Sequence, residues 1–140
     1  MIQEFLHLFA PLTANCKDFT HRWERAAALD ADSVSGRWEG EWISEATGHR
    51  GPLRAVLTVI APALWRVSFR ASYSGMLRAC YATDFNVSQQ DGRWRFSGGS
   101  DLGAIAGGRY EYAGSATLTE MACTYKSSRD HGEFRLQRPA

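Results

Sequence analysis

The chain has 140 residues, of which 16 are basic and 15 acidic, and its formal net charge at neutral pH is +1. This length suits one domain with a hydrophobic core of its own. Proteins that bind the phosphate backbone of nucleic acid normally carry a clear basic excess, so the charge balance argues against that class. We also expect no membrane partner, because no stretch is long enough to span a bilayer as an apolar helix.

The three cysteines are Cys16, Cys80 and Cys123. Their number is odd and no Cys-x-x-Cys motif occurs, which indicates neither a disulfide framework nor a zinc site. We therefore expect free thiols in a reducing compartment. No Lys or Arg precedes Lys17, so the basic start of a secretory signal is missing. Both observations predict a cytoplasmic protein.

Residues 1 to about 31 show helical periodicity. The second of two apolar patterns runs through Phe19, Trp23 and Ala26 to Ala27 and Leu29, and Thr13 and Asn15 are candidate N-caps for it. We predict an N-terminal helical segment, residues 1–33, that packs on or caps a domain formed by residues 34–140. The apolar stripe of this segment comprises Ile2, Phe5, Leu6, Phe9, Phe19 and Trp23.

From residue 37 onward the periodicity becomes two, as in β-strands. In the stretch GRWEGEW, residues 36–42, Trp38, Gly40 and Trp42 share one face. Gly40 would leave space for a bulky neighbour or permit a sharp coil of the strand. Further alternating runs cover 53–60, 65–73, 77–87, 94–96, 110–112, 118–125 and 134–136.

Turn residues separate these runs at 46–52, 61–63, 74–75, 91–92 and 127–132. Asp91-Gly92 is a strong hairpin signal, since a type I′ turn needs positive φ. The short connections favour antiparallel neighbours, and we count about eight strands. They would form a closed up-and-down barrel or a two-sheet sandwich, and the regular hairpins favour the barrel. The glycine-rich stretch 97–108 is expected to be a flexible loop between strands.

The Gly-x-Trp motif in GRWEGEW resembles the first strand of the calycin superfamily of lipocalins, fatty-acid-binding proteins and avidins. The segments 107–114 and 124–138 are similar to small bacterial lipocalin-like domains, for which no activity is implied. In such barrels a basic residue of the last strand packs over the tryptophan. The resemblance implies a contact between Arg138, which shares its phase with Phe134 and Leu136, and Trp38. We accordingly expect Trp38, Trp42 and Arg138 to be structural, with both tryptophans towards the closed end of the barrel and any pocket beside the tyrosines.

Tyrosines and one phenylalanine are the candidate ligand contacts. A few polar groups among aromatic rings fix the orientation of a ligand, and an eight-stranded barrel can hold one small ligand or be filled by side chains. We predict a small apolar or aromatic ligand and no cofactor; in a filled core, the hydroxyl groups would bond each other, Thr83 or water. The candidates are Phe69, Tyr73, Tyr81, Tyr110, Tyr112 and Tyr125.

An enzymatic function of isomerase, cyclase or decarboxylase type stays open, but we assign no catalytic residue. Glu39 and Glu41 could act as acid and base only if buried. Period two places both on the outer face, within a lattice of charges. The outward arginines of that lattice are Arg54, Arg66, Arg70, Arg78, Arg93 and Arg95. Of the residues that such an enzyme would need beside its tyrosines, only Arg138 is expected to point inward.

Histidines predict no metal site, because His7, His21, His49 and His131 have no metal-binding spacing. A haem-binding barrel of the nitrobindin type would take His131 as its axial ligand, although Trp42 replaces the third glycine of that family's opening motif. A protein-interaction module, including a homodimer, would use the apolar stripe of residues 1–31. Cys123 is expected to be a small buried apolar residue rather than a reactive thiol.

Overall fold

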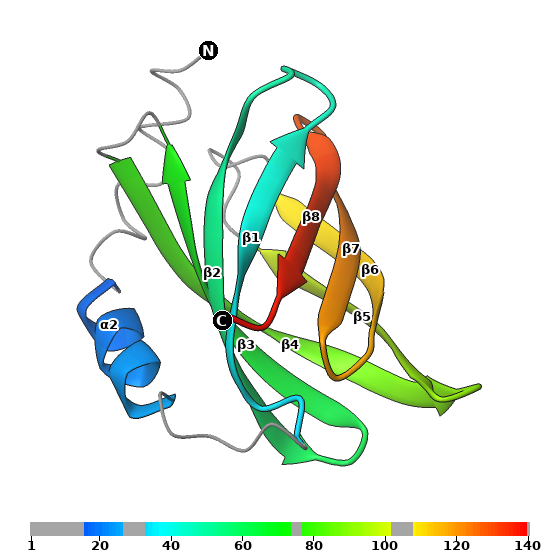
Figure 1. The fold of residues 1–140 in the computed structure, drawn as a ribbon. Coiled ribbons are helices and arrows are strands. Elements are labelled where there is room, and N and C mark those ends of the chain that lie inside the picture. The colour runs from blue at the N-terminus through cyan, green and yellow to red at the C-terminus, as the bar shows by residue number, and fades with distance from the viewer. Residues whose placement is uncertain (1–15, 27–32, 74–76, 102–107, 140) are drawn as a thin grey trace.

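Eight antiparallel strands form a closed barrel in a computed structural model, which describes residues 16–26, 33–73, 77–101 and 108–139 (Figure 1). Each strand pairs with the next along the chain, and the last pairs with the first. The predicted up-and-down barrel is thereby confirmed over the sandwich. The strands are β1 (Gly36–Ser44), β2 (Arg50–Ala61), β3 (Leu64–Tyr73), β4 (Leu77–Gln90), β5 (Arg93–Asp101), β6 (Arg109–Ala116), β7 (Glu120–Lys126) and β8 (His131–Gln137).

Strand β1 has the predicted alternation of faces. Trp38 and Trp42 are buried inside the barrel, whereas Glu39 and Glu41 form ion pairs on its outer surface. A Cβ atom at Gly40 would overlap the main-chain oxygen of Arg135 on β8. The glycine between the two tryptophans therefore lets the last strand approach the first, which closes the barrel.

The hairpin turn between β4 and β5 is the predicted Asp-Gly turn. Asp91 and Gly92 have φ angles of 53° and 75°, both in the left-handed region that a type I′ turn needs. The glycine-rich stretch 97–108 differs from its prediction, because β5 continues to Asp101 and pairs with β6 there. Residues 102–107 of that stretch lie outside the described residues. The alternation also fails at Val59, which is 41% exposed where the pairing of β2 with β3 shifts register.

Helix α2, Cys16–Arg25, lies against the outer surface of β2, β3 and β4 (Figure 1). Its Phe19 packs on Val56 and Cys80, which face out of the barrel and are nevertheless buried. The described part of the N-terminal segment thus covers the barrel wall. The other residues predicted to belong to the helical segment, 1–15, 27 and 29, lie outside the described residues, and so does His7. No helix within the described part is long and apolar enough to cross a membrane.

A disulfide joins Cys16 of α2 to Cys80 of β4. The expectation of free thiols is therefore wrong for these two cysteines, whose separation of 64 residues gave no local sign of pairing. Cys123 is free and buried, and its thiol donates to the main-chain oxygen of Thr124. Burial raises the pKa of this thiol, as suits an unreactive core residue.

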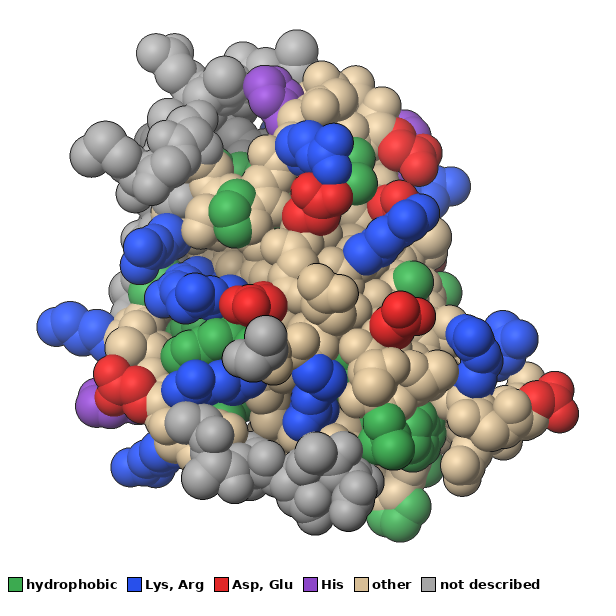
Figure 2. All heavy atoms as spheres, in the orientation of Figure 1, with side chains coloured by type: hydrophobic (Ala, Val, Ile, Leu, Met, Phe, Trp, Pro, Cys, Tyr) green, Lys and Arg blue, Asp and Glu red, His purple; other side chains and the backbone are tan. Residues whose placement is uncertain are grey.

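Outward arginines hold the helix in addition to the disulfide. The guanidinium carbons of Arg37 and Arg54 lie 4.7 and 4.8 Å from the ring centroid of Trp23. That of Arg70 lies 5.1 Å from the ring of Phe19. Elsewhere on the wall the arginines pair with acids, as Arg66 does with Asp84. Figure 2 accordingly shows basic and acidic side chains interspersed on the face that carries α2.

Candidate ligand-binding site

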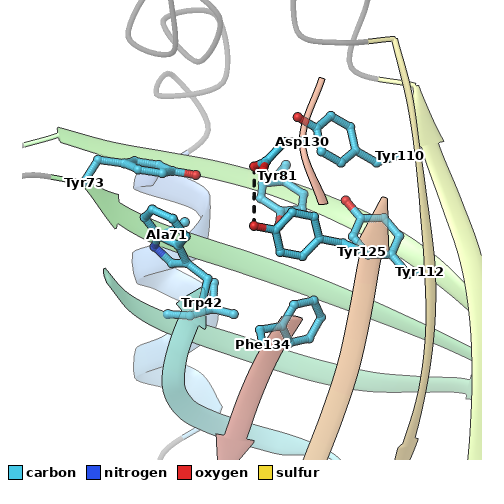
Figure 3. Close-up of a pocket in the computed structure, with 10 residues that line it drawn as sticks. Trp42, Ala71, Tyr73, Tyr81, Tyr110, Tyr112, Tyr125, Asp130 and Phe134 are labelled. Carbon is cyan, nitrogen blue, oxygen red and sulfur yellow. Dashed lines mark hydrogen bonds between the residues drawn. The ribbon is translucent and has the colours of Figure 1, made fainter. Parts of the chain in front are cut away.

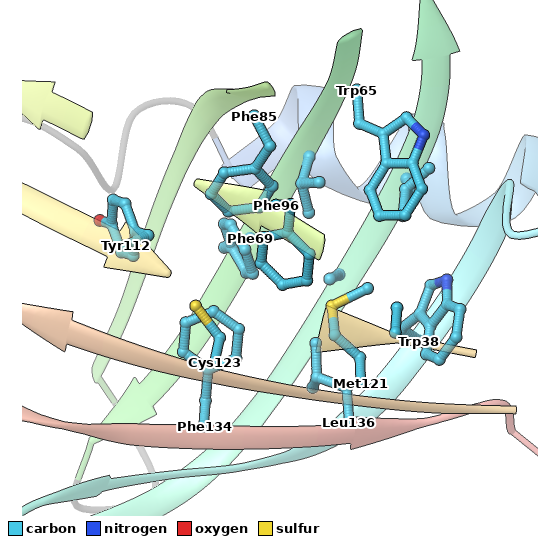
Figure 4. Close-up of a cluster of buried hydrophobic side chains, with 14 of the residues drawn as sticks. Trp38, Trp65, Phe69, Phe85, Phe96, Tyr112, Met121, Cys123, Phe134 and Leu136 are labelled. Atoms are coloured by element: carbon cyan, nitrogen blue, oxygen red, sulfur yellow. The ribbon is translucent and has the colours of Figure 1, made fainter. Parts of the chain in front are cut away.

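The middle of the barrel is filled by aromatic side chains (Figure 4). The ring centroids of Phe85 and Phe96 are 4.7 Å apart, and those of Phe69 and Phe134 are 5.4 Å apart. Trp65 is 1% exposed and contacts Phe96 from one side. These buried rings occupy this part of the described interior, so an end of the barrel is the better place for a ligand.

One end, which we call the Trp38 end, is closed by hydrogen-bonded side chains. The guanidinium of Arg138 lies 4.9 Å from the ring centroid of Trp38, in the contact that the resemblance implied. Arg138 also donates to the main-chain oxygens of Val34 and Ser35, at 3.0 and 2.9 Å. The indole N–H of Trp38 donates to the oxygen of Val34 at 2.8 Å. The indole N–H and both terminal nitrogens of the guanidinium thus hold the main chain before β1 at this end.

The opposite end, which we call the tyrosine end, contains a cavity of about 40 Å³ (Figure 3). All five predicted tyrosines line it. Phe69 does not; it lies deeper and stacks on Tyr81, with 5.2 Å between ring centroids. The described lining consists of Trp42, Leu53, Ala71, Tyr73, Tyr81, Tyr110, Tyr112, Tyr125, Asp130 and Phe134.

Strand alternation brings these rings together. Tyr110 and Tyr112 are two residues apart on β6 and face inward together. Tyr125 on β7 is paired with Gly132 on β8, where a Cβ atom would lie 2.7 Å from the Tyr125 hydroxyl oxygen and would overlap the main-chain oxygen of Ile43. Because Gly132 has no side chain, the Tyr125 ring can lie across β8 at this position.

Trp42 lies at this end rather than at the Trp38 end, where the sequence analysis expected both tryptophans to have structural roles. Its ring centroid is 4.7 Å from that of Tyr73, and its indole N–H donates to the main-chain oxygen of Ser72 at 3.1 Å. Trp38 and Trp42 are four positions apart on the same face of β1. Two tryptophans on one strand face therefore reach different ends.

Asp130 is the lining residue that the sequence analysis missed. It is 7% exposed, and its Oδ1 accepts a 2.6 Å hydrogen bond from the hydroxyl of Ser44. The Tyr125 hydroxyl lies 3.4 Å from Oδ2 and also 3.5 Å from the oxygen of Ile43. An aspartate in a turn before a strand is ordinarily solvated, and nothing in the stretch SSRDHG indicated that this one points inward.

Burial raises the pKa of every tyrosine around the cavity. The effect is large for Tyr73 and Tyr81, and for Tyr73 the nearby tyrosines and Asp130 add to it. The Ser100 and Tyr81 hydroxyls oppose the rise at Tyr112 without cancelling it. The end thus offers neutral phenols.

The residues considered for other functions lie elsewhere. His131 is on the exposed face at the start of β8, with Nε2 3.8 Å from Oε2 of Glu45, and His21 and His49 are exposed. The described residues contain no group of His, Cys, Asp and Glu that could hold a metal ion. Glu39 and Glu41 face outward beside Arg54 and Arg50. Arg138 points inward only at the Trp38 end, so it is not beside the tyrosines.

No family model and no curated protein matches the sequence. Among solved structures, the chain is similar to a redesigned β-barrel, mFAP1, bound to DFHBI, with 13% identity, a TM-score of 0.56 and coverage of 77% of this chain and 97% of that one. A second structure is a siderocalin, Ex-FABP, with 18% identity, a TM-score of 0.46 and coverage of 76% of this chain and 74% of that one. A third is a mutant of the fluorescent protein UnaG, with 8% identity, a TM-score of 0.43 and coverage of 76% of this chain and 96% of that one. The likeness to the redesigned barrel concerns the fold alone. With the closed eight-stranded meander and the Trp38–Arg138 contact, it gives a calycin-like barrel fold.

Proposed function

We propose that the protein binds a small molecule at the tyrosine end of the barrel. The observation that carries this proposal is the convergence of five tyrosines and Trp42 on one cavity, whereas buried aromatic rings pack against one another in the middle of the barrel. Aromatic walls with a few polar groups are typical of ligand pockets. The redesigned barrel with the same fold was solved with a small molecule bound, which supports the view that such a barrel can hold one.

The size of the cavity restricts the ligand. A dry cavity that accepts benzene measures about 150 Å³, and a single water needs about 10–15 Å³. The 40 Å³ here would hold a few waters or one compact chemical group. Tyr73 and Tyr125 are only partly buried, so a larger ligand would have to displace these rings and bind at the mouth. We therefore expect one compact group of an apolar or aromatic ligand to enter the cavity.

A binding experiment with a filling variant tests this function. Ala71 lines the cavity and is 3% exposed, so Ala71→Leu would fill part of the space. Ala82→Leu adds the same volume on the exposed face of β4 and serves as the matched control. In a titration with tert-butanol followed by ¹H–¹⁵N NMR, we expect the wild type and the control to show saturable shifts around the cavity and Ala71→Leu to show none. Equal shifts in all three folded proteins would contradict the proposal.

The compartment needs a revised proposal. The expectation of a cytoplasmic location depended on free thiols, yet Cys16 and Cys80 are joined. Disulfides persist mainly in oxidising compartments. We therefore favour an oxidising compartment for the folded protein over the cytoplasm. Thiol labelling of the protein in cells, before and after reduction, tests this. Two protected cysteines would support it, and prompt labelling of Cys16 and Cys80 would favour the cytoplasm.

An interaction function through the N-terminal segment remains an alternative. Phe19 and Trp23, the two described members of the apolar stripe, already contact the barrel wall, and Phe19 is 2% exposed. These two side chains therefore already pack against the chain's own barrel. A homodimer would have to use other residues, and light scattering of the full chain would detect it as a doubled mass.

A further inference from the structure

The tyrosine end combines aromatic rings with one carboxylate and no basic residue among its described lining. In Figure 3, Asp130 lies with Tyr81 and Tyr125 between two groups of rings, Trp42 with Tyr73 on one side and Tyr110 with Tyr112 on the other. We propose that this pocket accepts the positively charged head of a small organic cation, such as an alkylammonium group. The inference rests on the proposed ligand-binding function and names the ligand class for it.

The rings supply a negative potential that suits a cation. The face of an aromatic ring is electron-rich, and cations within about 6 Å of a ring centroid are attracted to it, more strongly when water is excluded. Here the centroids of Trp42 and Tyr73 are 4.7 Å apart and those of Tyr110 and Tyr125 6.4 Å apart. Several rings therefore border one small space. Burial keeps their phenols protonated, so the hydroxyl oxygens can also accept hydrogen bonds from an ammonium.

Asp130 supplies a full negative charge without a basic partner. No ion pair involving this residue occurs within the part of the chain that the structure describes. Its Oδ1 is held by Ser44 at 2.6 Å, while the Tyr125 hydroxyl stays 3.4 Å from Oδ2. A carboxylate can accept about four hydrogen bonds. Because a buried charge is costly unless it is paired, a bound cation would compensate Asp130.

Other charges near the mouth are at its rim. Burial raises the pKa of Tyr110, and the charge of the exposed Arg129 opposes that rise slightly, so Arg129 acts weakly at this end. It would oppose a bound cation. His131 and Glu45 form an exposed pair with 55% and 63% of their side chains accessible. Of these groups only Asp130 lines the cavity, so we expect it to decide the charge preference.

A simpler role for Asp130 would be a latch between two turns. Its bond to Ser44 links the turn after β1 to the turn before β8, and the main-chain N–H of Glu45 donates to the oxygen of His131 beside it. A latch predicts that the pocket prefers neutral ligands. The two roles differ in the effect of ligand charge at constant shape.

The test uses three probes with the same tert-butyl group and different charges. At neutral pH, tert-butylammonium is positive, tert-butanol neutral and pivalate negative. Binding to the full chain is followed by ¹H–¹⁵N NMR at the indole N–H of Trp42. We expect tert-butylammonium to bind about tenfold more tightly than tert-butanol, which corresponds to one added charged hydrogen bond, and pivalate to bind most weakly. Equal binding of tert-butylammonium and tert-butanol would overturn the cation preference but not the proposed binding site. No shift with any probe would overturn both.

Two variants locate the preference. Asp130→Asn should lose the tenfold advantage of tert-butylammonium over tert-butanol, whereas Glu120→Gln, which makes the same charge change at the start of β7 and thus at the other end, should keep that advantage. An unchanged preference in a folded Asp130→Asn would overturn the inference. If Asp130→Asn does not fold, Arg129→Glu should strengthen cation binding, with Arg93→Glu at the far hairpin as its control. Equal affinities of these two variants for tert-butylammonium would contradict cation binding at the tyrosine end.

Discussion

The two ends of the barrel use aromatic residues in different ways. At the Trp38 end, the indole N–H and the guanidinium of Arg138 donate to the main-chain oxygens of Val34 and Ser35, and Trp38 is fully buried. At the tyrosine end, the Tyr125 hydroxyl makes long contacts to Asp130 and to the oxygen of Ile43, and a cavity lies among the rings. Hydrogen bonds to the main chain close the first end, whereas the second end keeps a cavity, where we propose that a ligand binds.

Removal of Trp38 should have the largest effect. Trp38→Ala deletes a fully buried indole and leaves Arg138 without its ring. We expect the free energy of unfolding in urea to fall by about 3–5 kcal/mol. Tyr110→Phe at the other end, which deletes one hydroxyl and keeps the ring, is the contrasting variant and should stay within about 1 kcal/mol of the wild type. A loss well under 1 kcal/mol for Trp38→Ala would show that this end does not anchor the fold.

Arg138→Met should be the next largest change. The variant keeps an apolar chain over Trp38 but loses the cation–π contact and two hydrogen bonds from a charged group. Because each of these is individually modest, we expect a loss of about 2 kcal/mol in urea unfolding. Arg95→Met, on the exposed face of β5, is the matched control and should change stability little. Similar losses of stability in Arg138→Met and Arg95→Met would contradict the role of Arg138 in closing this end.

The tyrosines should resist ionisation. Burial raises the pKa of Tyr73 and Tyr81 well above the ordinary value near 10. Below that pH both the folded and the unfolded chain keep the phenol protons, so these groups give no pH dependence. Above it the unfolded chain loses protons first, and stability falls as the pH rises. Ultraviolet titration should show fewer ionised tyrosines in the folded protein than in urea at pH 11. Identical curves would mean that the tyrosine end is open to water.

Tyr125→Phe should have the smallest effect on stability. Its hydroxyl makes two long hydrogen bonds, 3.4 Å to Asp130 and 3.5 Å to the oxygen of Ile43. We expect a change of under about 1 kcal/mol in unfolding, together with altered NMR shifts of Asp130 and of Trp42. A loss as large as that of Arg138→Met would show that the hydrogen bonding at the two ends is equally strong.

The residues differ in how far the sequence could predict them. Alternation placed Trp38 inward on β1 and Arg138 inward just after β8, because a strand face depends only on local phase. It also brought the five tyrosines to the interior. Whether an inward residue lies at one end or the other depends on register around the barrel, which is why Trp42 was expected at the wrong end. The Cys16–Cys80 bond and the inward turn of Asp130 depend on tertiary packing that spacing does not reveal.

The most direct test of the difference between the ends compares two indole N–H signals in one titration with tert-butylammonium. Trp42 borders the cavity and Trp38 closes the opposite end. We predict a saturable shift of the Trp42 signal with the Trp38 signal unchanged. Shifts of equal size at both indoles, or a shift of Trp38 alone, would contradict the assignment of the ligand site to the tyrosine end.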